Sequence, residues 1–302
     1  MLIVKLKDQL GNQMFSYASV KSIALKRNLK FGYYRMPLDE KYINDTDVKY
    51  GNDLSTIFNL PLEEQIKLLP DNITTYCERK VNERNREDYK ELVINEIPDD
   101  CIVDGHFITS EFINDYKSEL GQWFRFPDDV HNKIINKVSE LKNNTGAPIV
   151  SVHFRVGKDY FERGYRLDSS YWEQAANIIK KRFPDAVFVC LYDKKNKAVK
   201  RFMEKFNAID ARGSLVDDLC LISQCDINIV CNSTFSIMGA LLNNNGVLKL
   251  CPSIYPSSNG YNLIHVYPKD WVKVDNSKVD RFSRFVGGIR RYLIKIKRIF
   301  IK

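Results

Sequence analysis

The sequence has little of what marks metal-binding, disulfide-bonded or membrane-spanning proteins. Its four histidines lack the spacing of a metal site, and its seven cysteines are an odd number without a CxxC pair. No apolar run approaches the roughly 20 residues that a membrane-spanning helix needs. The opening run MLIVKLKD has no long apolar core of the signal-peptide type. We therefore expect a cytoplasmic protein with free buried thiols and no metal.

Acidic residues are absent from one stretch, and this absence decides the charge of the whole chain. Lysine and arginine number 46 and aspartate and glutamate 38, so the net charge is 46 − 38 = +8. Residues 281–302 contain eight cations and no acid, and these eight account for the entire excess. The rest of the chain is formally neutral. This argues against nucleic-acid binding, which favours a basic face on the folded body.

The order of predicted strands and helices indicates an α/β protein. With 44% hydrophobic and 28% charged residues, the 302-residue chain is typical of a globular protein large enough for two domains. In the first half we expect strands over 2–6, 29–34 and 101–107, and helices over 14–26, 110–120 and 127–141. In the second half we expect strands over 149–154, 186–192, 226–231 and 247–251, alternating with helices from Ser170 onward and over 194–206, 215–224 and 235–242. Repeated strand–helix units of this kind form parallel sheets covered by helices.

A run of turn-forming residues, 143–146, marks the predicted boundary between two halves. We expect an N-terminal α/β half, a C-terminal α/β half and a tail. Their predicted bounds are 1–145, 146–275 and 276–302. Residues 37–95 show poor periodicity, and we expect loops and short helices there. The helix at Ser170 is predicted to open with a capping box completed by Glu173.

Ionisable residues gather at the end of the strand predicted over 149–154. His153 lies within the strand, and Arg155, Lys158 and Asp159 follow it. Open parallel sheets bind ligands at the carboxyl ends of their strands, and an arginine there can hold a phosphate or carboxylate through two parallel hydrogen bonds. An ordinary charged surface loop explains this segment, taken alone, equally well.

A second polar segment has the same position relative to its own strand. Asn232, Ser233 and Thr234 follow the strand predicted over 226–231, and a helix starts immediately at Phe235. The free N–H groups in the first turn of such a helix can point at an anion in the crevice. Capping of the helix by serine or threonine is the simpler explanation of this segment on its own.

Three motifs occur in a set order along the chain. They are LGNQMFSYA over residues 10–18, VHFR with the following GKDY over 152–160, and NSTFS over 232–236. This set resembles glycosyltransferase family 11, the α-1,2-fucosyltransferases, over about residues 1–35 and 100–250. The resemblance implies a GT-B-like fold of two Rossmann-like halves with GDP-fucose bound between them. The half over 1–145 would be the acceptor side and the half over 146–275 the nucleotide-sugar side. It also implies that fucose is transferred to a galactose 2-hydroxyl with inversion, without a metal or a cofactor.

The resemblance also assigns roles to particular residues. Arg155 would bind the diphosphate and stabilise the leaving GDP, and His153 and Asp159 would line the same pocket. The donor-binding residues would be Gly11, Asn12, Gln13, Asn232, Ser233, Thr234 and Phe235. The acceptor hydroxyl must lose a proton, and both His153 and Asp159 stay open as its base.

Several positions depart from the family's pattern. The family usually has a second arginine where this chain has Val156, and Lys158 shifts the aspartate by one position. Gln9 replaces the first glycine of the opening motif. Three alternatives therefore stay open: fucosyl transfer, transfer of another sugar from a different nucleotide, and a relative that binds nucleotide or glycan without catalysis.

The tail over 281–302 has the pattern of a basic amphipathic helix. Apolar residues such as Phe285, Ile289 and Leu293 recur at three- and four-residue steps between its cations. Such a helix binds an anionic membrane surface. We expect a peripheral protein on the inner face of the membrane, beside lipid-linked galactose-terminated acceptors and active in surface polysaccharide assembly. The alternative is a helix that docks on its own domain.

Overall fold

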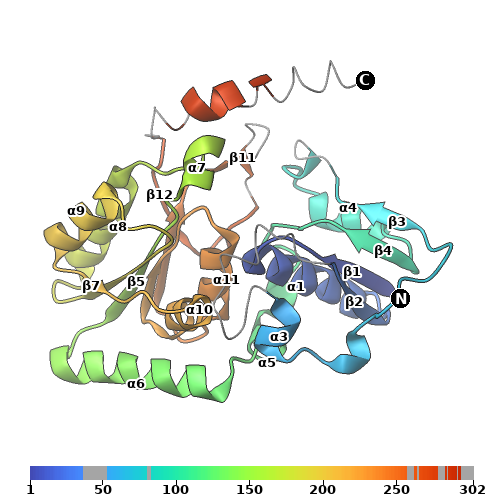
Figure 1. Cartoon of the computed structure of the whole chain (residues 1–302), viewed down its shortest axis with the longest axis horizontal. Coiled ribbons are helices and arrows are strands. Elements are labelled where there is room, and N and C mark those ends of the chain that lie inside the picture. The colour runs from blue at the N-terminus through green and yellow to red at the C-terminus, as the bar shows by residue number, and fades with distance from the viewer. Residues whose placement is uncertain are drawn as a thin grey trace.

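Two parallel β-sheets form the frame of the protein (Figure 1). The computed structural model describes residues 1–36, 53–79, 83–256, 262–263, 265–277, 283, 285–290 and 292–293. Within both sheets every pair of neighbouring strands is parallel. The α/β class predicted from the sequence is therefore confirmed.

The first sheet has four strands in the order β2-β1-β4-β3. Their bounds are β1 (Leu2–Leu6), β2 (Phe31–Arg35), β3 (Thr75–Cys77) and β4 (Cys101–Asp104). Leu2 of β1 lies opposite Phe31 on one side and Cys101 on the other. The loops that follow β1 and β4 consequently leave the same edge of this sheet.

The second sheet has six strands in the order β12-β9-β8-β5-β6-β7. Their bounds are β5 (Ile149–Phe154), β6 (Val187–Tyr192), β7 (Ile209–Asp210), β8 (Ile227–Ile229), β9 (Leu248–Pro252) and β12 (Val272–Val274). The antiparallel pair β10 (Tyr255–Pro256) and β11 (Asn262–Leu263) is separate. Every residue of β5 is buried, as expected for a central parallel strand covered on both faces.

Helices cover the sheets and meet between them. The α-helices are α1 (Leu10–Lys26), α3 (Leu54–Phe58), α4 (Tyr89–Glu96), α5 (Leu120–Trp123), α6 (Asp128–Thr145), α7 (Lys158–Arg163), α8 (Ser169–Arg182), α9 (Lys197–Phe206), α10 (Leu215–Gln224) and α11 (Thr234–Leu242). Two 3-10 helices are η1 (Leu62–Glu64) and η3 (Asn114–Glu119). Helix α1 packs against α11 at the junction of the two sheets (Figure 1), and buried side chains from both halves form one continuous core.

Helix α6 precedes the boundary predicted at residue 145, yet it lies along the C-terminal sheet (Figure 1). It packs against α10. Lys133 of α6 lies 2.7 Å from Asp217 of α10, and Lys142 lies 2.7 Å from Asp226, which begins the approach to β8. The first sheet is thus joined to the second both through α6 and through the contact between α1 and α11.

Some predicted helix starts were wrong for identifiable reasons. Helix α1 begins at Leu10 instead of Met14, because packing against α11 stabilises a first turn that contains the weak helix formers Gly11 and Asn12. The loop predicted after β5 contains the short helix α7. The capping box predicted for α8 is absent, since the N-cap is Asp168, whose carboxylate accepts a hydrogen bond from the backbone of Ser170.

The poorly periodic stretch 37–95 contains short elements, as predicted, although residues 37–52 and 80–82 lie outside the described residues. Helices α3, η1 and most of α4 fall in this stretch, together with the unpredicted strand β3. Strand β3 has three residues with little burial, which explains why no periodic pattern announces it.

The described part of the tail is helical and lies on α7 (Figure 1). The Ser283 hydroxyl donates to the carbonyl of Phe161 at 2.8 Å, and Arg290 pairs with Glu162 at 2.8 Å. Gly287 rests directly on the chain at Arg163, where an added Cβ would lie 2.7 Å from the carbonyl carbon. The tail therefore docks through small and polar residues. Its apolar residues Phe285, Ile289, Tyr292 and Leu293 stay exposed.

We predict that Gly11→Ala lowers the free energy of unfolding by about 1–3 kcal/mol, because the new methyl group overpacks the junction of the two sheets. Its Cβ would lie 2.3 Å from the backbone nitrogen of Phe235 and 2.7 Å from Thr234 Oγ1. Urea unfolding measures the change. Gly121→Ala is the control, since no atom lies within 4 Å of its added Cβ. Equal losses in the two variants would contradict the close contact.

Candidate functional site

Parallel pairing of β5 with β8 brings the two polar motifs to one edge of the C-terminal sheet. Val150 lies opposite Ile227 and Val152 opposite Ile229. Arg155 follows the end of β5, and the segment that begins α11 follows β8. The carboxyl ends of parallel strands share an edge, so both motifs face the crevice in which such sheets bind ligands.

The Arg155 guanidinium is held by three neighbours. Its Nη2 lies 2.8 Å from Asp159 Oδ2, its Nη1 lies 3.1 Å from Asp193 Oδ2, and its carbon lies 5.1 Å from the centroid of the Tyr160 ring. Burial opposes the charge, but Tyr160, Asp193 and Asp159 together raise the Arg155 pKa above its ordinary value. The guanidinium is therefore always charged, and it is fixed before any ligand arrives.

Asp193 was missed by the sequence interpretation, although it organises the loop after β5. Its carboxylate accepts hydrogen bonds from the backbone N–H groups of Val156 at 2.8 Å and Gly157 at 2.9 Å, besides pairing with Arg155. A Cβ on Gly157 would lie 2.5 Å from Asp193 Oδ2, so a side chain at this position would push the carboxylate away from its backbone donors. An acid directly after the strand predicted over 186–192 was the available signal, because β6 neighbours β5 in the sheet.

Tyr160 joins the loop after β5 to the loop after β8. Its hydroxyl donates to the backbone carbonyl of Asn232 at 2.9 Å. The Asn232 amide nitrogen donates to the carbonyl of Tyr165 at 2.7 Å. The buried Oδ1 of Asn232 has no hydrogen-bond partner among the described residues. Tyr160 and Asn232 therefore tie neighbouring loops together at this edge.

The structure does not support simple capping, the alternative explanation for the first turn of α11. Ser233 occupies the N-cap position, but its side chain makes no capping hydrogen bond. The hydroxyl of Ser236 instead accepts from the backbone N–H of Cys231 at 3.3 Å. The N–H groups of Thr234 and Phe235 at the start of a nine-residue helix are consequently left without a cap from Ser233. Such a helix end, with its partial positive charge, suits an anion.

His153 lies beneath this edge instead of in the open crevice. Its side chain is 6% exposed, its Nδ1 lies 3.3 Å from Cys231 Sγ, and its ring centroid lies 5.4 Å from that of Phe235. Burial, with the charge of Arg155, lowers the pKa of His153 to about 3. The imidazole is therefore neutral at physiological pH, and it packs behind Phe235.

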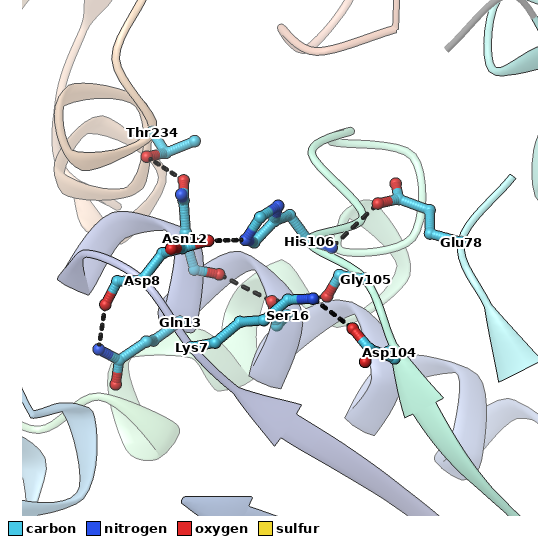
Figure 2. Close-up of polar contacts among 10 residues, drawn as sticks. All are labelled: Lys7, Asp8, Asn12, Gln13, Ser16, Glu78, Asp104, Gly105, His106 and Thr234. Carbon is cyan, nitrogen blue, oxygen red and sulfur yellow. Dashed lines mark hydrogen bonds and ion pairs between the residues drawn. The ribbon is translucent and has the colours of Figure 1, made fainter. Parts of the chain in front are cut away.

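The opening motif approaches the same helix end from the other half (Figure 2). Thr234 Oγ1 donates to Asn12 Oδ1 at 2.9 Å, and Gly11 lies against the backbone of Phe235. The side chain of Gln13 turns inward instead: it is 2% exposed and its Nε2 donates to the carbonyl of Asp8 at 2.8 Å. Asn12 and Gly11 face the junction, whereas Gln13 holds the loop that positions them.

Neither Lys158 nor Val156 adds a positive charge beside the Arg155 guanidinium. Lys158 is 85% exposed and extends along α7 toward Glu162, at 3.6 Å. Val156 is 1% exposed and belongs to the hydrophobic core. Arg155 is thus the cation that the loop after β5 presents at the edge. Among the described residues, no group of three or more histidine, cysteine or acidic side chains could hold a metal ion.

An arginine and an uncapped helix end lie at one edge of a parallel sheet in this α/β protein, an arrangement that suits an anionic ligand. Residues 53–275 match the profile of glycosyl transferase family 11. Because this match spans more than half of the chain, the protein belongs to that family. It is a glycosyltransferase similar to the galactoside α-1,2-fucosyltransferases.

Three relatives illustrate the breadth of the family. Galactoside 2-alpha-L-fucosyltransferase Sec1 of Mus musculus is 23% identical, with 91% of this chain and 74% of the relative covered. Alpha-1,2-colitosyltransferase of Escherichia coli is 24% identical, with 91% and 99% covered. The O-antigen biosynthesis glycosyltransferase WbnK of Escherichia coli is 26% identical, with 79% and 89% covered. Sec1 extends beyond the matched region, whereas the colitosyltransferase matches over nearly its whole length. Sec1 is named for fucose and the second relative for colitose.

We predict that Asp193→Asn lowers the free energy of unfolding by about 1–3 kcal/mol, because the amide nitrogen of asparagine would face a backbone N–H donor. One of the two hydrogen bonds to Val156 and Gly157 would be lost, along with the charge opposite Arg155. Urea unfolding measures the loss. Asp210→Asn is the control, since Asp210 is 39% exposed and the amide oxygen of asparagine can replace its Oδ2, which accepts from Lys195 and Tyr192. Equal effects of the two changes would contradict the organising role of Asp193.

Proposed function

We propose that the protein transfers fucose from GDP-fucose to the 2-hydroxyl of a β-galactoside, with inversion at the sugar and without a metal ion. The observation that carries this proposal is the convergence of Arg155 with the start of α11 across β5 and β8. The family and the names of its α-1,2-transferring members support the chemistry. A role in surface polysaccharide synthesis draws support from the relative named for O-antigen biosynthesis.

In this proposal the diphosphate binds between Arg155 and the first turn of α11. When the bond from the sugar to the phosphate oxygen breaks, negative charge collects on the departing GDP. Fixed donors aimed at that charge stabilise the transition state more than the ground state. Arg155, the N–H groups of Thr234 and Phe235, and the hydroxyl of Ser233 supply those donors. Asp159 and Asp193 keep the guanidinium in place, so no reorganisation is needed during the reaction.

The junction between the halves would then hold the nucleotide and sugar. Asn232, with its unpaired Oδ1, and Phe235, with its partly exposed ring, lie beside the phosphate position. Gly11 and Asn12 close the site from the N-terminal half through their contacts with α11. The acceptor would approach from that half.

A second donor is favoured by one relative. The α-1,2-colitosyltransferase matches over 99% of its length, so a different nucleotide-activated sugar fits the same protein length and linkage. Thermal shift with GDP, UDP and CMP identifies the nucleotide, and release of GDP from a panel of GDP-sugars then identifies the sugar. A protein that binds GDP but neither transfers nor slowly hydrolyses any donor would instead be the non-catalytic relative.

We predict that Arg155→Ala lowers transfer by about 10²–10³-fold, because the departing diphosphate loses its fixed charge partner. Release of GDP from GDP-fucose, with and without a β-galactoside, measures the effect, and urea unfolding checks that the variant is folded. Arg125→Ala is the control, because that side chain is 77% exposed and pairs with Asp128 on the surface. An Arg155→Ala enzyme as active as the control would remove the basis of the proposed function.

We also propose that the tail contacts an anionic membrane surface, which would place the enzyme next to lipid-linked acceptors. Every helix in the described ranges is too short or too polar to span a bilayer. Docking on α7 leaves Phe285 65% exposed and Leu293 53% exposed, beside the cations of the tail. Apolar side chains next to cations are the features by which a helix binds at the interface of anionic lipids.

We predict that Phe285→Ser combined with Leu293→Ser weakens binding to vesicles containing phosphatidylserine by at least about tenfold, because each apolar side chain contributes more than 1 kcal/mol on burial. Sedimentation with vesicles measures binding, and transfer to a soluble acceptor should be unchanged. The matched control is Leu62→Ser with Leu68→Ser, since these leucines are 80% and 85% exposed elsewhere. Undiminished vesicle binding by the tail variant would refute membrane contact through Phe285 and Leu293.

A further inference from the structure

A histidine–carboxylate pair lies at the edge of the N-terminal sheet (Figure 2). His106 Nε2 lies 2.7 Å from Asp8 Oδ2. Asp8 belongs to the turn between β1 and α1, and His106 follows β4, so the parallel pairing of β1 with β4 places both at one edge. The side chains are 27% and 39% exposed for His106 and Asp8 respectively. The pair is thus rigidly joined yet open to a ligand.

The backbone around the pair is strained. Asp8 has φ = 64° and Phe107 has φ = 47°, in the left-handed region that residues other than glycine rarely adopt. Phe107 is fully buried, and the N–H of His106 donates to Glu78 Oε2 at 2.9 Å. A Cβ on Gly105 would lie 2.3 Å from Glu78 Cβ. Several contacts therefore hold His106 in one position at an energetic cost, as is common at functional sites.

Contacts connect this pair to the start of α11. Thr234 donates to the side chain of Asn12, and the Ser16 hydroxyl lies 2.9 Å from the backbone carbonyls of both Asn12 and Gly105. Figure 2 shows Asp8 and His106 beside these contacts. Both belong to the N-terminal half, whereas Thr234 belongs to the C-terminal half. The pair thus belongs to the half opposite Arg155, where the acceptor is proposed to bind.

The two bases left open by the sequence are less suited to the task. His153 is buried behind Phe235 and is a very weak base there. Asp159 lies 2.8 Å from the Arg155 guanidinium, on the side of the leaving group. Inversion requires the acceptor to attack from the face opposite the leaving phosphate, so its base belongs on the other side of the sugar.

We propose that His106 is the general base of the transfer reaction and that Asp8 is its positioning residue, an inference that rests on the proposed function. With Nε2–H donating to Asp8, the neutral imidazole presents Nδ1 as a proton acceptor, and no partner contacts Nδ1 within the described part of the chain. As the acceptor oxygen forms its bond to C1 of fucose, its proton passes to Nδ1. The electron pair of the breaking C1–O bond leaves with GDP, and Asp8 stabilises the resulting imidazolium.

The charged groups near His106 come from β4 and from the segments after β1 and β3, and Lys7 and Asp104 pair with each other at the same edge (Figure 2). Asp8 faces its ring from the turn after β1, and Glu78, after β3, accepts from its backbone N–H. Arg84 pairs with Glu78 at 3.1 Å. Across the junction, α11 presents Thr234, which carries no charge. Asp8 is therefore the charged side chain bonded to the ring, and its removal tests the pair directly.

The experiment compares full-length wild type with His106→Gln and Asp8→Asn. Glutamine keeps a donor near Asp8 but has no basic nitrogen, and asparagine tolerates the left-handed backbone of position 8. We expect His106→Gln to lower kcat for transfer to a β-galactoside by about 10²–10⁴-fold, with KM for GDP-fucose unchanged. Asp8→Asn should give an intermediate loss in kcat.

Controls separate this inference from the function on which it rests. His131→Gln, on α6, should behave as wild type in every assay. A thermal shift with GDP reports folding and donor binding of each variant. If the wild type transfers fucose and His106→Gln transfers it equally fast, the proposed catalytic pair is wrong while the proposed function stands. A loss of GDP binding equal to the loss of transfer in both variants would also overturn it, by assigning the pair a purely structural role. Wild type that releases no GDP from GDP-fucose would refute the function itself.

Discussion

The parallel register of β5 with β8 is the constraint on which the site depends. It places Arg155 and the start of α11 at one edge, although about 80 residues separate them in the chain. Neither group alone distinguishes a phosphate site from a surface loop or a capped helix. Two side chains then fix the positions of the two loops. Asp193 anchors the loop after β5, and Tyr160 joins that loop to the one after β8.

The second constraint is the close approach of α1 to α11. Gly11 allows the two helix starts to touch, and Asn12 hydrogen-bonds Thr234 across the junction. One hydrophobic core runs through both sheets at this point, so the two edges are held at a fixed separation. A transferase needs such an arrangement, since the sugar and the incoming hydroxyl must be aligned before the bond breaks.

Much of this architecture could be predicted from the sequence, because buried strands are short apolar runs and parallel sheets fix which loops share an edge. The positions of Arg155 and the segment from Asn232 to Phe235 followed from that rule. The sequence could not decide whether the Ser233 side chain caps α11, because the cap depends on a rotamer that the sequence does not specify. Asp193 and the pair of Asp8 with His106 were missed because each acts through a partner distant in the chain.

The structure shows what the residues that depart from the family's pattern do in this protein. Asp8 and Gln9 form a turn at which the backbone takes the left-handed conformation, and the aspartate makes contact there with His106. A glycine would relieve the strain at position 8 but could not hold the imidazole. Val156 fills the core instead of adding a second cation next to Arg155, which is flanked by two carboxylates. In the proposed reaction Arg155 would stabilise the leaving group, and the histidine–aspartate pair of the other half would activate the acceptor.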